Sequence, residues 1–277
     1  MSYEQSVADP TVGQWLEKPI REVDGRRYRR YVIRTHLIRP GEKLEKTLLP
    51  YLQDLLQPGD MLVLGEKAVA IAEGRAVPLK QVHPRPLARW LSRHVRSLGY
   101  GLGLKRPETM EMAFREVGVP RMMVAAALGA VDRVIGRSGD FYRIAGRKVA
   151  SIDGPGPTTI APYNHDIVLA PRQADRLVDT LARKFRCTVA VVDVNDMGSE
   201  VLAVSSPSEG RVIRQLLMDN PMGQGGQGTP LAVLRPLPEN RNHAPWAVPV
   251  GLHPAGAVWP FPGGADAPVE WAEDLSE

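Results

Sequence analysis

The sequence contains a single cysteine and no long apolar run. One cysteine, Cys187, excludes an intramolecular disulfide framework and a zinc site built from several cysteines. No apolar stretch approaches the roughly 20 residues that a membrane-spanning helix needs. Residues 1–15 lack the charged start and apolar run of a signal peptide. We therefore expect a cytoplasmic protein with no membrane partner, in which Cys187 is a buried structural thiol.

Several catalytic signatures are also missing. The sequence has no nucleophile-elbow motif and no evident Ser–His–Asp set, so a hydrolytic triad has little support. It has neither the Gly-Lys-Ser/Thr phosphate-binding loop nor a dinucleotide fingerprint, and no internal repeat. The chemistry must therefore be sought in loops that are particular to this sequence.

The composition predicts a globular chain with a modest positive charge. Its 277 residues, 43% of them hydrophobic, can bury a core in one large domain or two interlocked lobes. The formal net charge of +4 raises the alternative of nucleic-acid binding. Only residues 21–34 are dense in arginine, however, and a basic strand edge or an anion site explains that segment as well. We therefore expect no nucleic-acid partner.

Apolar periodicity predicts an α/β (α+β) fold, with a mixed sheet and flanking helices. The expected strands are 28–38, 61–64, 167–169, 188–194 and 231–234, with a hairpin over 139–153 and a further short apolar piece at 67–72. The expected helices are 44–56, 84–98, 107–118, 174–185 and 209–218, and residues 122–134 form a helix followed by a strand. Residues 188–194 are apolar on both faces, which is typical of a central strand.

The same patterns divide the chain into three parts. Residues 1–25 are polar and are expected to be irregular, and residues 26–237 form the folded domain. Residues 238–277 are dominated by proline, glycine and polar residues, so we expect a tail without a core of its own.

Two loops offer charged or oxygen ligands. In the first, Lys67 follows Gly65 closely, and a lysine near a glycine turn can hold a phosphate by charge. In the second, residues 193–198 place aspartate and asparagine after the central strand, where their oxygens suit a hard cation such as Mg²⁺. For the first loop, an ordinary strand and turn with solvated charges is the favoured explanation. For the second, local capping of backbone groups explains the residues as well as a cation does.

A third loop, residues 222–230, is rich in glycine. Four glycines between positions 223 and 228 are too dense for most turns, and they let successive backbone N–H groups face an anion. A fourth stretch, residues 152–166, mixes potential ligands with rigid Gly-Pro turns. His165 in that stretch is typical of a surface residue, and His36 is left as either a packing residue or a phosphate contact.

Taken in order, these segments resemble the gamma-glutamyl ligases of coenzyme F-420 biosynthesis. The matching motifs are Leu-Ile-Arg-Pro-Gly-Glu (37–42), the run from 59–64 through Ala-Glu-Gly-Arg (72–75), residues 189–198, and the Gly-x-Gly-Gly-x-Gly-x-Pro loop. A divergent bacterial branch of that family is more similar still. It carries Ile-Asp-Gly-Pro and Pro-Tyr-Asn (152–155 and 162–164), Asn-Asp-Met-Gly (195–198) and Asp-Asn-Pro-Met-Gly-Gln-Gly (219–225).

The resemblance implies a gamma-glutamyl ligase-like fold, a homodimer, GTP as substrate, and Mg or Mn. In that chemistry GTP phosphorylates a carboxylate, and the amine of glutamate then displaces phosphate. By position, nucleotide contacts fall at Thr35, His36, Leu37, Ile38, Glu66, Lys67, Met222, Gly223, Gln224, Gly225, Gly226, Gln227, Gly228 and Thr229. Metal ligands fall at Asp153, Asn164, Asn195, Asp196 and Gln224. The resemblance assigns no catalytic residue.

This sequence departs from the family pattern at its charged positions. Amides stand at Asn195, Gln224 and Gln227 where the family has acids, and Ile71 stands in place of a lysine. Amide oxygens can bind hard cations but carry no charge. Two readings follow: a ligase with an altered acceptor, or a homologue that binds a nucleotide or another phosphorylated ligand without turnover and has a degenerate metal site.

Overall fold

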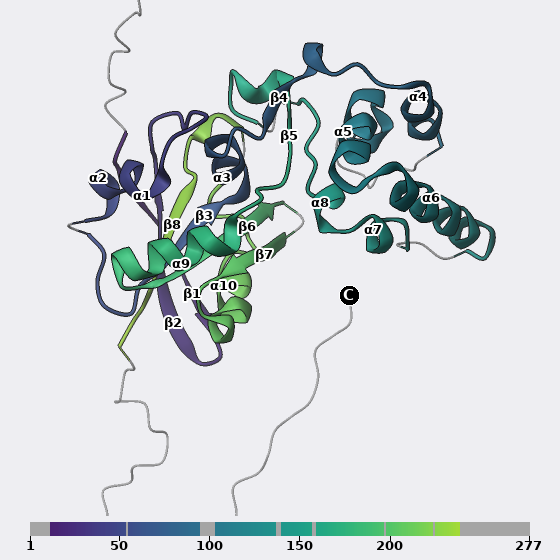
Figure 1. The fold of residues 1–277 in the computed structure, drawn as a ribbon. Helices are drawn as coiled ribbons and strands as arrows, with labels where there is room; N and C mark the ends of the chain where they lie inside the picture. Colours follow the sequence, from purple (N-terminus) through teal and green to yellow (C-terminus); the bar gives the residue numbers. More distant parts are fainter. Residues whose placement is uncertain are drawn as a thin grey trace, which may run out of the picture. The chain divides into compact units, whose positions relative to one another are not determined.

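A six-stranded mixed sheet organises the fold (Figure 1). The computed structural model describes residues 12–53, 55–94, 103–136, 140–156, 159–196, 198–223 and 225–238. The strand order is β1-β2-β8-β3-β6-β7. The strands are β1 (Trp15–Val23), β2 (Arg26–Ile33), β3 (Met61–Gly65), β6 (Thr188–Asn195), β7 (Gly198–Val204) and β8 (Leu231–Pro236). The expectation of an α/β fold with a mixed sheet and flanking helices is confirmed.

The strand directions bring four chain segments to one edge of the sheet. β3 runs parallel to β6, with Gly65 opposite Val192, and antiparallel to β8. β2 is also antiparallel to β8, with Ile33 opposite Leu231. The carboxyl ends of β2, β3 and β6 therefore lie at the same edge as the amino end of β8. Open sheets in α/β proteins bind ligands beyond the carboxyl ends of their strands.

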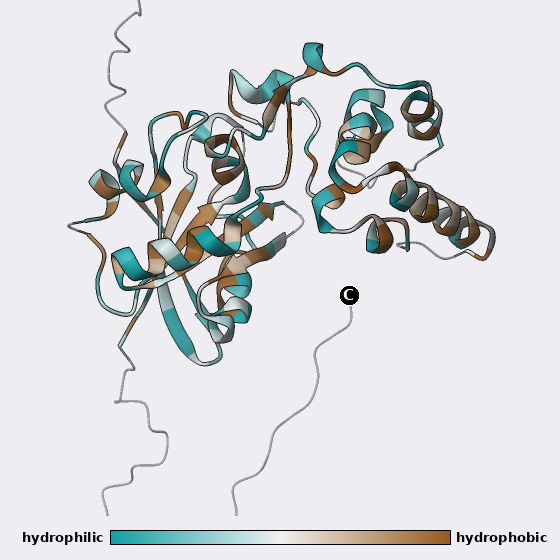
Figure 2. Cartoon of the chain, in the orientation of Figure 1, coloured by the Kyte–Doolittle hydropathy of each residue, from teal (hydrophilic) through white to brown (hydrophobic). Residues whose placement is uncertain are grey.

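Each face of the sheet is covered by a helix. Side chains alternate along β6, so Val189 and Val191 join the cluster that contains α9 (Ala174–Phe185). Ala190 and Val192 join the opposite cluster, which contains α10 (Gly210–Leu216). The strands at the centre of the sheet are correspondingly apolar in Figure 2. The prediction of an interior strand that is apolar on both faces is confirmed, because β6 lies between β3 and β7.

A third apolar cluster belongs to helices between residues 86 and 150. These are α4 (Pro86–Ser92), α5 (Pro107–Val117), α6 (Val119–Val134), α7 (Asp140–Ala145) and α8 (Arg147–Ala150). A two-stranded sheet of β4 (Ala76–Pro78) and β5 (Asp166–Val168) connects this region to the rest of the chain, and Ile167 and Leu169 pack into the helical cluster.

Short helices complete the described structure. They are α1 (Leu44–Thr47), α2 (Leu49–Leu52), α3 (Glu66–Ala72) and 3-10 turns at Leu79–Gln81, Gly103–Lys105, Tyr163–His165, Pro207–Glu209 and Gly225–Gln227. None of the helices in the described ranges is long and apolar enough to span a bilayer. Cys187 is half-buried just before β6, and burial raises the pKa of its thiol to about 11, so the thiol stays protonated at neutral pH.

The predicted hairpin over 139–153 is wrong, and so is the strand at the end of 122–134. The first segment forms α7 and α8, and the second lies within a single helix, α6. A Cβ built at Gly129 of α6 would come within 3.0 Å of the Cβ of Phe141. Glycine at this position therefore lets α6 and α7 pack closely, and this tertiary contact outweighs the β-like alternation of residues 141–144.

Three further expectations need correction. The irregular segment predicted through residue 25 contains β1, an edge strand whose side chains are exposed or partly exposed except for Val23. The apolar piece at 67–72 belongs to helix α3. The helix predicted over 44–56 is divided into α1 and α2, with a proline in the first turn of α2. The end of the helix predicted over 84–98, and the tail from residue 239 onward, lie outside the described residues.

Candidate functional site

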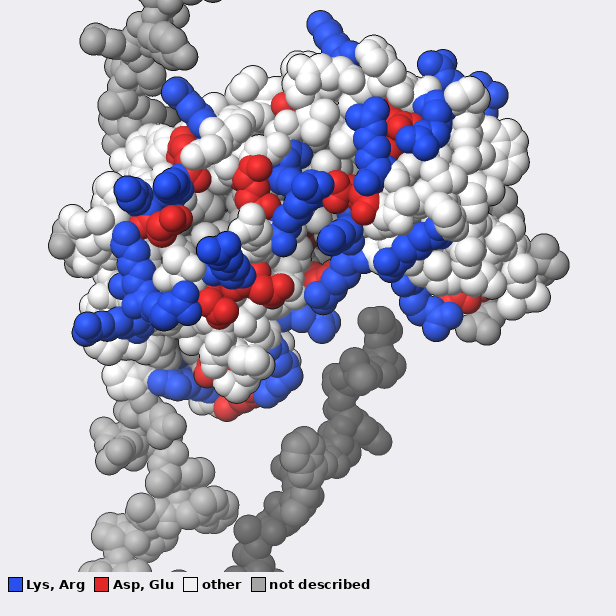
Figure 3. Space-filling model, viewed as in Figure 1, with Lys and Arg blue, Asp and Glu red and all other residues white. Residues whose placement is uncertain are grey.

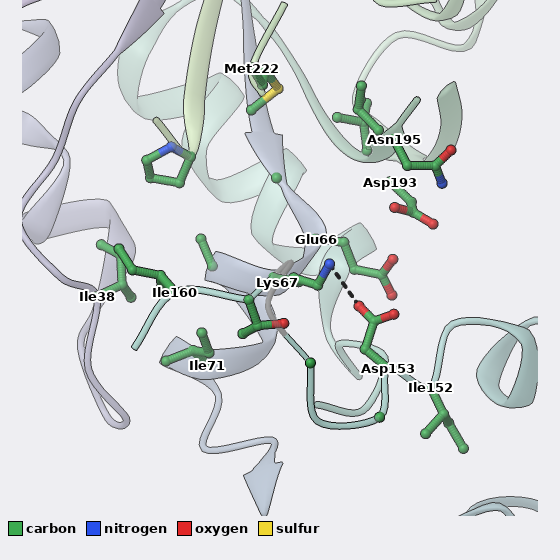
Figure 4. A pocket seen from close by; sticks show the side chains of 18 of the residues that line it. Ile38, Glu66, Lys67, Ile71, Ile152, Asp153, Ile160, Asp193, Asn195 and Met222 are labelled. Carbon is green, nitrogen blue, oxygen red and sulfur yellow. Dashed lines mark ion pairs between the residues drawn. The ribbon is translucent and has the colours of Figure 1, made fainter. Parts of the chain in front are cut away.

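A cavity of about 710 Å³ lies at the sheet edge where the four segments meet (Figure 4). Its size falls in the range of small-molecule sites. The lining comes from residues 35–38, 65–68, 152–156, 192–195, 222–223 and 227–230, together with residues of the helical region. Most residues that the family resemblance assigned to nucleotide contact therefore share one cavity.

Backbone hydrogen bonds hold these segments together. The N–H of Thr35 donates to the carbonyl of Gly228 at 3.0 Å, and the N–H of Gly65 donates to the carbonyl of Pro230 at 2.8 Å. Gly65 lies opposite Val192 in the parallel ladder. Glu66, the first residue of α3, and Asp193, the next residue of β6, follow this pair, and the charge of Asp193 acts on Glu66. The register of the sheet thus positions the charged residues of the cavity.

Four ionisable side chains form what we call the charged wall: Glu66, Lys67, Asp153 and Asp193. The Nζ of Lys67 lies 2.9 Å from Oδ2 of Asp153 (Figure 4). Asp153 is fixed by two backbone hydrogen bonds of 2.9 Å to Val168. The Lys67 side chain is 38% exposed and lines the cavity.

Burial and mutual repulsion shift the pKa values of the charged wall. Glu66 is 8% exposed and its Oε1 has no hydrogen-bond partner. Burial, together with the charges of Asp193 and Asp153, raises the pKa of Glu66 to about 8. Burial and Asp153 also raise the pKa of Asp193. Burial lowers the pKa of Lys67, but its carboxylate neighbours outweigh that effect and the net shift is upward. At pH 7, Lys67 is charged and Glu66 is largely neutral.

The glycine loop forms an uncharged wall of the cavity. Gly223 and Gly228 have φ values of 71° and 64°, which side chains rarely adopt. A Cβ at Gly223 would collide with the side chain of Gln227. The hydroxyl of Thr229 donates to the carbonyl of Met222 at 2.5 Å and ties the two ends of the loop together.

Not every predicted loop residue reaches the cavity. Met222, Gly223 and residues 227–229 line it, whereas Gly226 lies in the adjoining 3-10 turn and is not part of the lining. Gln224 lies outside the described residues. In the described part of the loop, its two ends therefore form the cavity wall.

The segment at 35–38 lines the opposite part of the cavity. His36 lies 2.7 Å from the hydroxyl of Tyr51 through Nδ1 and 3.1 Å from Glu42 through Nε2. The hydroxyl of Thr35 donates to the carbonyl of His36 at 2.8 Å. The Thr35 hydroxyl and the His36 imidazole are thus bonded within the protein, so this segment presents mainly its backbone and the apolar side chains of Leu37 and Ile38 to the cavity.

The predicted metal ligands are not gathered into one site. The Asp153 carboxylate faces Lys67, and Oδ1 of Asp196 accepts a hydrogen bond of 2.9 Å from Asn220. Asn195 lines the cavity, but Asp196 and Asn164 do not. The Oδ1 of Asn164 is buried and has no hydrogen-bond partner. No group of three or more His, Cys, Asp or Glu within the described ranges has the arrangement to hold a metal ion. The donor set in these described ranges does not fit a protein-held divalent cation.

Sequence reasoning offered Asp193 only as an oxygen ligand in the loop after the central strand. The structure places it within β6, on the same face as Asn195, where it lines the cavity. Arg106 also lines the cavity, directly before α5, and its buried Nε has no partner. Its position before Pro107 marked only the start of a helix, and nothing in the sequence linked it to the distant loops.

Three arginines of the arginine-rich segment make ion pairs within the protein. Arg30 is buried and forms a bidentate pair with Asp219, at 2.6 and 2.9 Å. Arg21 binds the same carboxylate at 2.9 Å, and Arg29 pairs with Glu17 at 3.1 Å. On the face shown in Figure 3, Lys and Arg are interspersed with Asp and Glu.

A family model described as F420-0:Gamma-glutamyl ligase matches residues 32–203. The match covers more than half of the chain and includes every member of the charged wall. The chain belongs to this ligase family. A search of curated proteins found no match. The matched range ends before the glycine loop, so the place of that loop in the gamma-glutamyl ligase cavity rests on the structure alone.

Proposed function

We propose that this family member is a GTP-dependent ligase that joins the amine of glutamate to a small carboxylate acceptor different from that of coenzyme F-420 synthesis. Family membership supports the ligase type. The observation that carries the proposal is the single cavity in which residues 35–38, 66–67 and the ends of the glycine loop meet. The substituted acids of the family pattern support an altered acceptor.

In the proposed reaction, the acceptor carboxylate takes the terminal phosphoryl group of GTP and GDP is released. The amine of glutamate then attacks the acyl phosphate, and phosphate leaves as the amide forms. The task of the protein is to hold these groups in line and to neutralise the charge that develops. Lys67 provides an ammonium group at the cavity wall.

Two features of the cavity suit a phosphorylated ligand. The raised pKa of Glu66 keeps most of this carboxyl neutral at pH 7, which reduces repulsion of phosphate oxygens. Arg106 adds a second cation to the lining. Mg²⁺ or Mn²⁺ enters this scheme only as part of the nucleotide substrate.

The family also supports a homodimer in the cytoplasm as the working form of the enzyme. Light scattering coupled to size-exclusion chromatography measures the mass of the particle directly. We expect twice the mass of one chain, and the mass of a single chain would contradict the dimer.

A second function is binding of a nucleotide or another phosphorylated ligand without turnover. The observation that favours it is the engagement of Asp153 and Asp196 by neighbouring side chains, together with the amide at Asn195. A family member with these contacts can keep the cavity and still lack a catalytic metal site.

Thermal unfolding with GTP, ATP or GDP, each with and without Mg²⁺ or Mn²⁺, tests nucleotide binding. A ligand at 100 times its dissociation constant stabilises the folded state by about 2.7 kcal/mol. We expect a shift with GTP, and no shift with any nucleotide would contradict the ligase and nucleotide binding, leaving only another phosphorylated ligand for the second function.

Phosphate release then separates the two functions. The ligase requires release that depends on glutamate and on an added carboxylate, with glutamate-free and acceptor-free reactions as controls. Binding without release would favour the non-catalytic function.

A further inference from the structure

The charged wall gathers three carboxyl groups around one ammonium. The Lys67 Nζ contacts Asp153 at 2.9 Å, the charge of Asp193 also acts on it, and the carboxyl-bearing Glu66 lines the same cavity. Figure 4 shows the Asp153, Glu66 and Asp193 carboxyls on one side of the cavity. Glu66 is more than nine-tenths buried, with an unpartnered Oε1. Three acidic groups in one cavity are ordinarily balanced by a cation, and here the ammonium of Lys67 is in contact with one of them.

The remaining predicted ligands in the described part of the chain do not complete a cation site beside Lys67. Asp196 is exposed and bonded to Asn220, and Asn164 does not line the cavity. Asn195 does line it, but its amide oxygen carries no charge. An ammonium on a flexible stem supplies a compact positive charge and three donors without any requirement for coordination geometry. It therefore tolerates a donor set that a divalent ion does not.

We infer that Lys67 takes the place of a protein-held divalent cation in this chain, balancing Asp153 and offering its ammonium to a phosphorylated ligand. The assignment to a phosphorylated ligand rests on the proposed function, whereas the replacement of the cation does not. The inference also explains the amide substitutions. Where the resident cation carries one positive charge instead of two or more, fewer carboxylates are needed to balance it.

Removing the Lys67 ammonium should allow the carboxyl groups of the charged wall to bind a metal cation. The experiment measures Mn²⁺ binding to the full chain by electron paramagnetic resonance of the free ion. It compares wild type with Lys67→Met, Lys67→Arg and the matched control Lys184→Met. Lys184 is an exposed lysine of α9 that does not line the cavity. Thermal unfolding confirms that each variant is folded.

We expect Lys67→Met to bind Mn²⁺ at least about tenfold more tightly than wild type. The attraction between a carboxylate and a divalent cation at ~4 Å, even when solvent screens it, exceeds the free energy that corresponds to a tenfold change in affinity. Lys67→Arg and Lys184→Met should both retain the weak binding of wild type. Adding Asp153→Asn to Lys67→Met should abolish the gain. Equal Mn²⁺ affinity in wild type and Lys67→Met would overturn the inference.

A second comparison covers the case in which Lys67→Met does not fold. Wild type and Asp153→Asn should then bind Mn²⁺ equally weakly, since neither has a vacant cation site. Tight, stoichiometric binding to wild type that Asp153→Asn removes would overturn the inference. None of these measurements uses nucleotide or turnover, so failure of the ligase reaction and failure of the lysine replacement are told apart.

Discussion

The charged wall and the glycine loop border the same cavity but are built on opposite principles. In the charged wall, Lys67 and Asp153 are paired at 2.9 Å, so their charges are partly balanced by each other before any ligand binds. In the glycine loop, two backbone positions with positive φ bring peptide groups to the cavity surface without any charge. Substitutions in the charged wall should therefore change pH and cation dependence, whereas substitutions in the loop should change ligand binding at every pH.

The largest expected effect is on the charged wall at alkaline pH. Glu66 has a pKa of about 8 in the folded chain, well above the ordinary value of 4.5. The folded state therefore holds a proton that the unfolded state releases, and stability falls as pH rises from about 5 to 8. Glu66→Gln cannot ionise, so we expect it to flatten this slope and to stabilise the protein at pH 8.5 by on the order of 3 kcal/mol.

Urea unfolding at pH 5.5, 7 and 8.5 measures this effect. Glu22→Gln is the matched control, because Glu22 is an exposed residue of β1 and does not line the cavity. The pH slope of this control should equal that of wild type. If Glu66→Gln keeps the wild-type pH dependence of stability, Glu66 has an ordinary pKa, and the charged wall does not confer the expected pH dependence.

An intermediate effect is expected in the glycine loop. Gly228→Val forces a β-branched residue into a φ of 64°, which costs about 1–3 kcal/mol of stability. Gly25→Val is matched for strain, with a φ of 76°, but lies in the β1–β2 turn away from the cavity. We expect similar losses of stability in both, and a loss of GTP binding in Gly228→Val alone. Calorimetric titration with GTP decides the matter, and equal affinity in the two variants would exclude the loop from the nucleotide site.

The smallest effect is expected at Asp196, outside both walls. Asn at this position keeps an Oδ1 that can accept from Asn220, so Asp196→Asn should change stability by less than about 0.5 kcal/mol. Nucleotide-induced thermal shifts should match those of wild type with and without Mg²⁺. If Asp196→Asn instead abolishes the metal response, the protein holds a divalent cation at the strand end, and Lys67 has not taken its place.

Strong local patterns were sufficient to predict several elements. β6 and α9 are close to their expected bounds, because a β-branched run and a regular apolar stripe each admit few alternatives. β1 was missed since an edge strand needs no apolar face, and β7 was not anticipated either. The short helix α3 is buried over residues 69–72 and so lacks the polar face that marks a helix in sequence.

The site could be predicted only as far as its individual loops. The resemblance assigned Glu66, Lys67 and the ends of the glycine loop to one ligand, and the structure places them around one cavity. It could not show that Asp153 pairs with Lys67 or that Asp193 and Arg106 also line the cavity. Those relations depend on strand register and helix placement, which bring together residues more than 80 positions apart.

The parallel register of β3 and β6 also has an evolutionary consequence. Because Gly65 lies opposite Val192, positions 66 and 193 are neighbours although they are 127 residues apart in sequence. A second acid at either position is tolerated only while the other can stay protonated or be neutralised. Natural variation at the two positions should therefore be coupled, with the loss of one acid relaxing the constraint on the other and on the lysine between them.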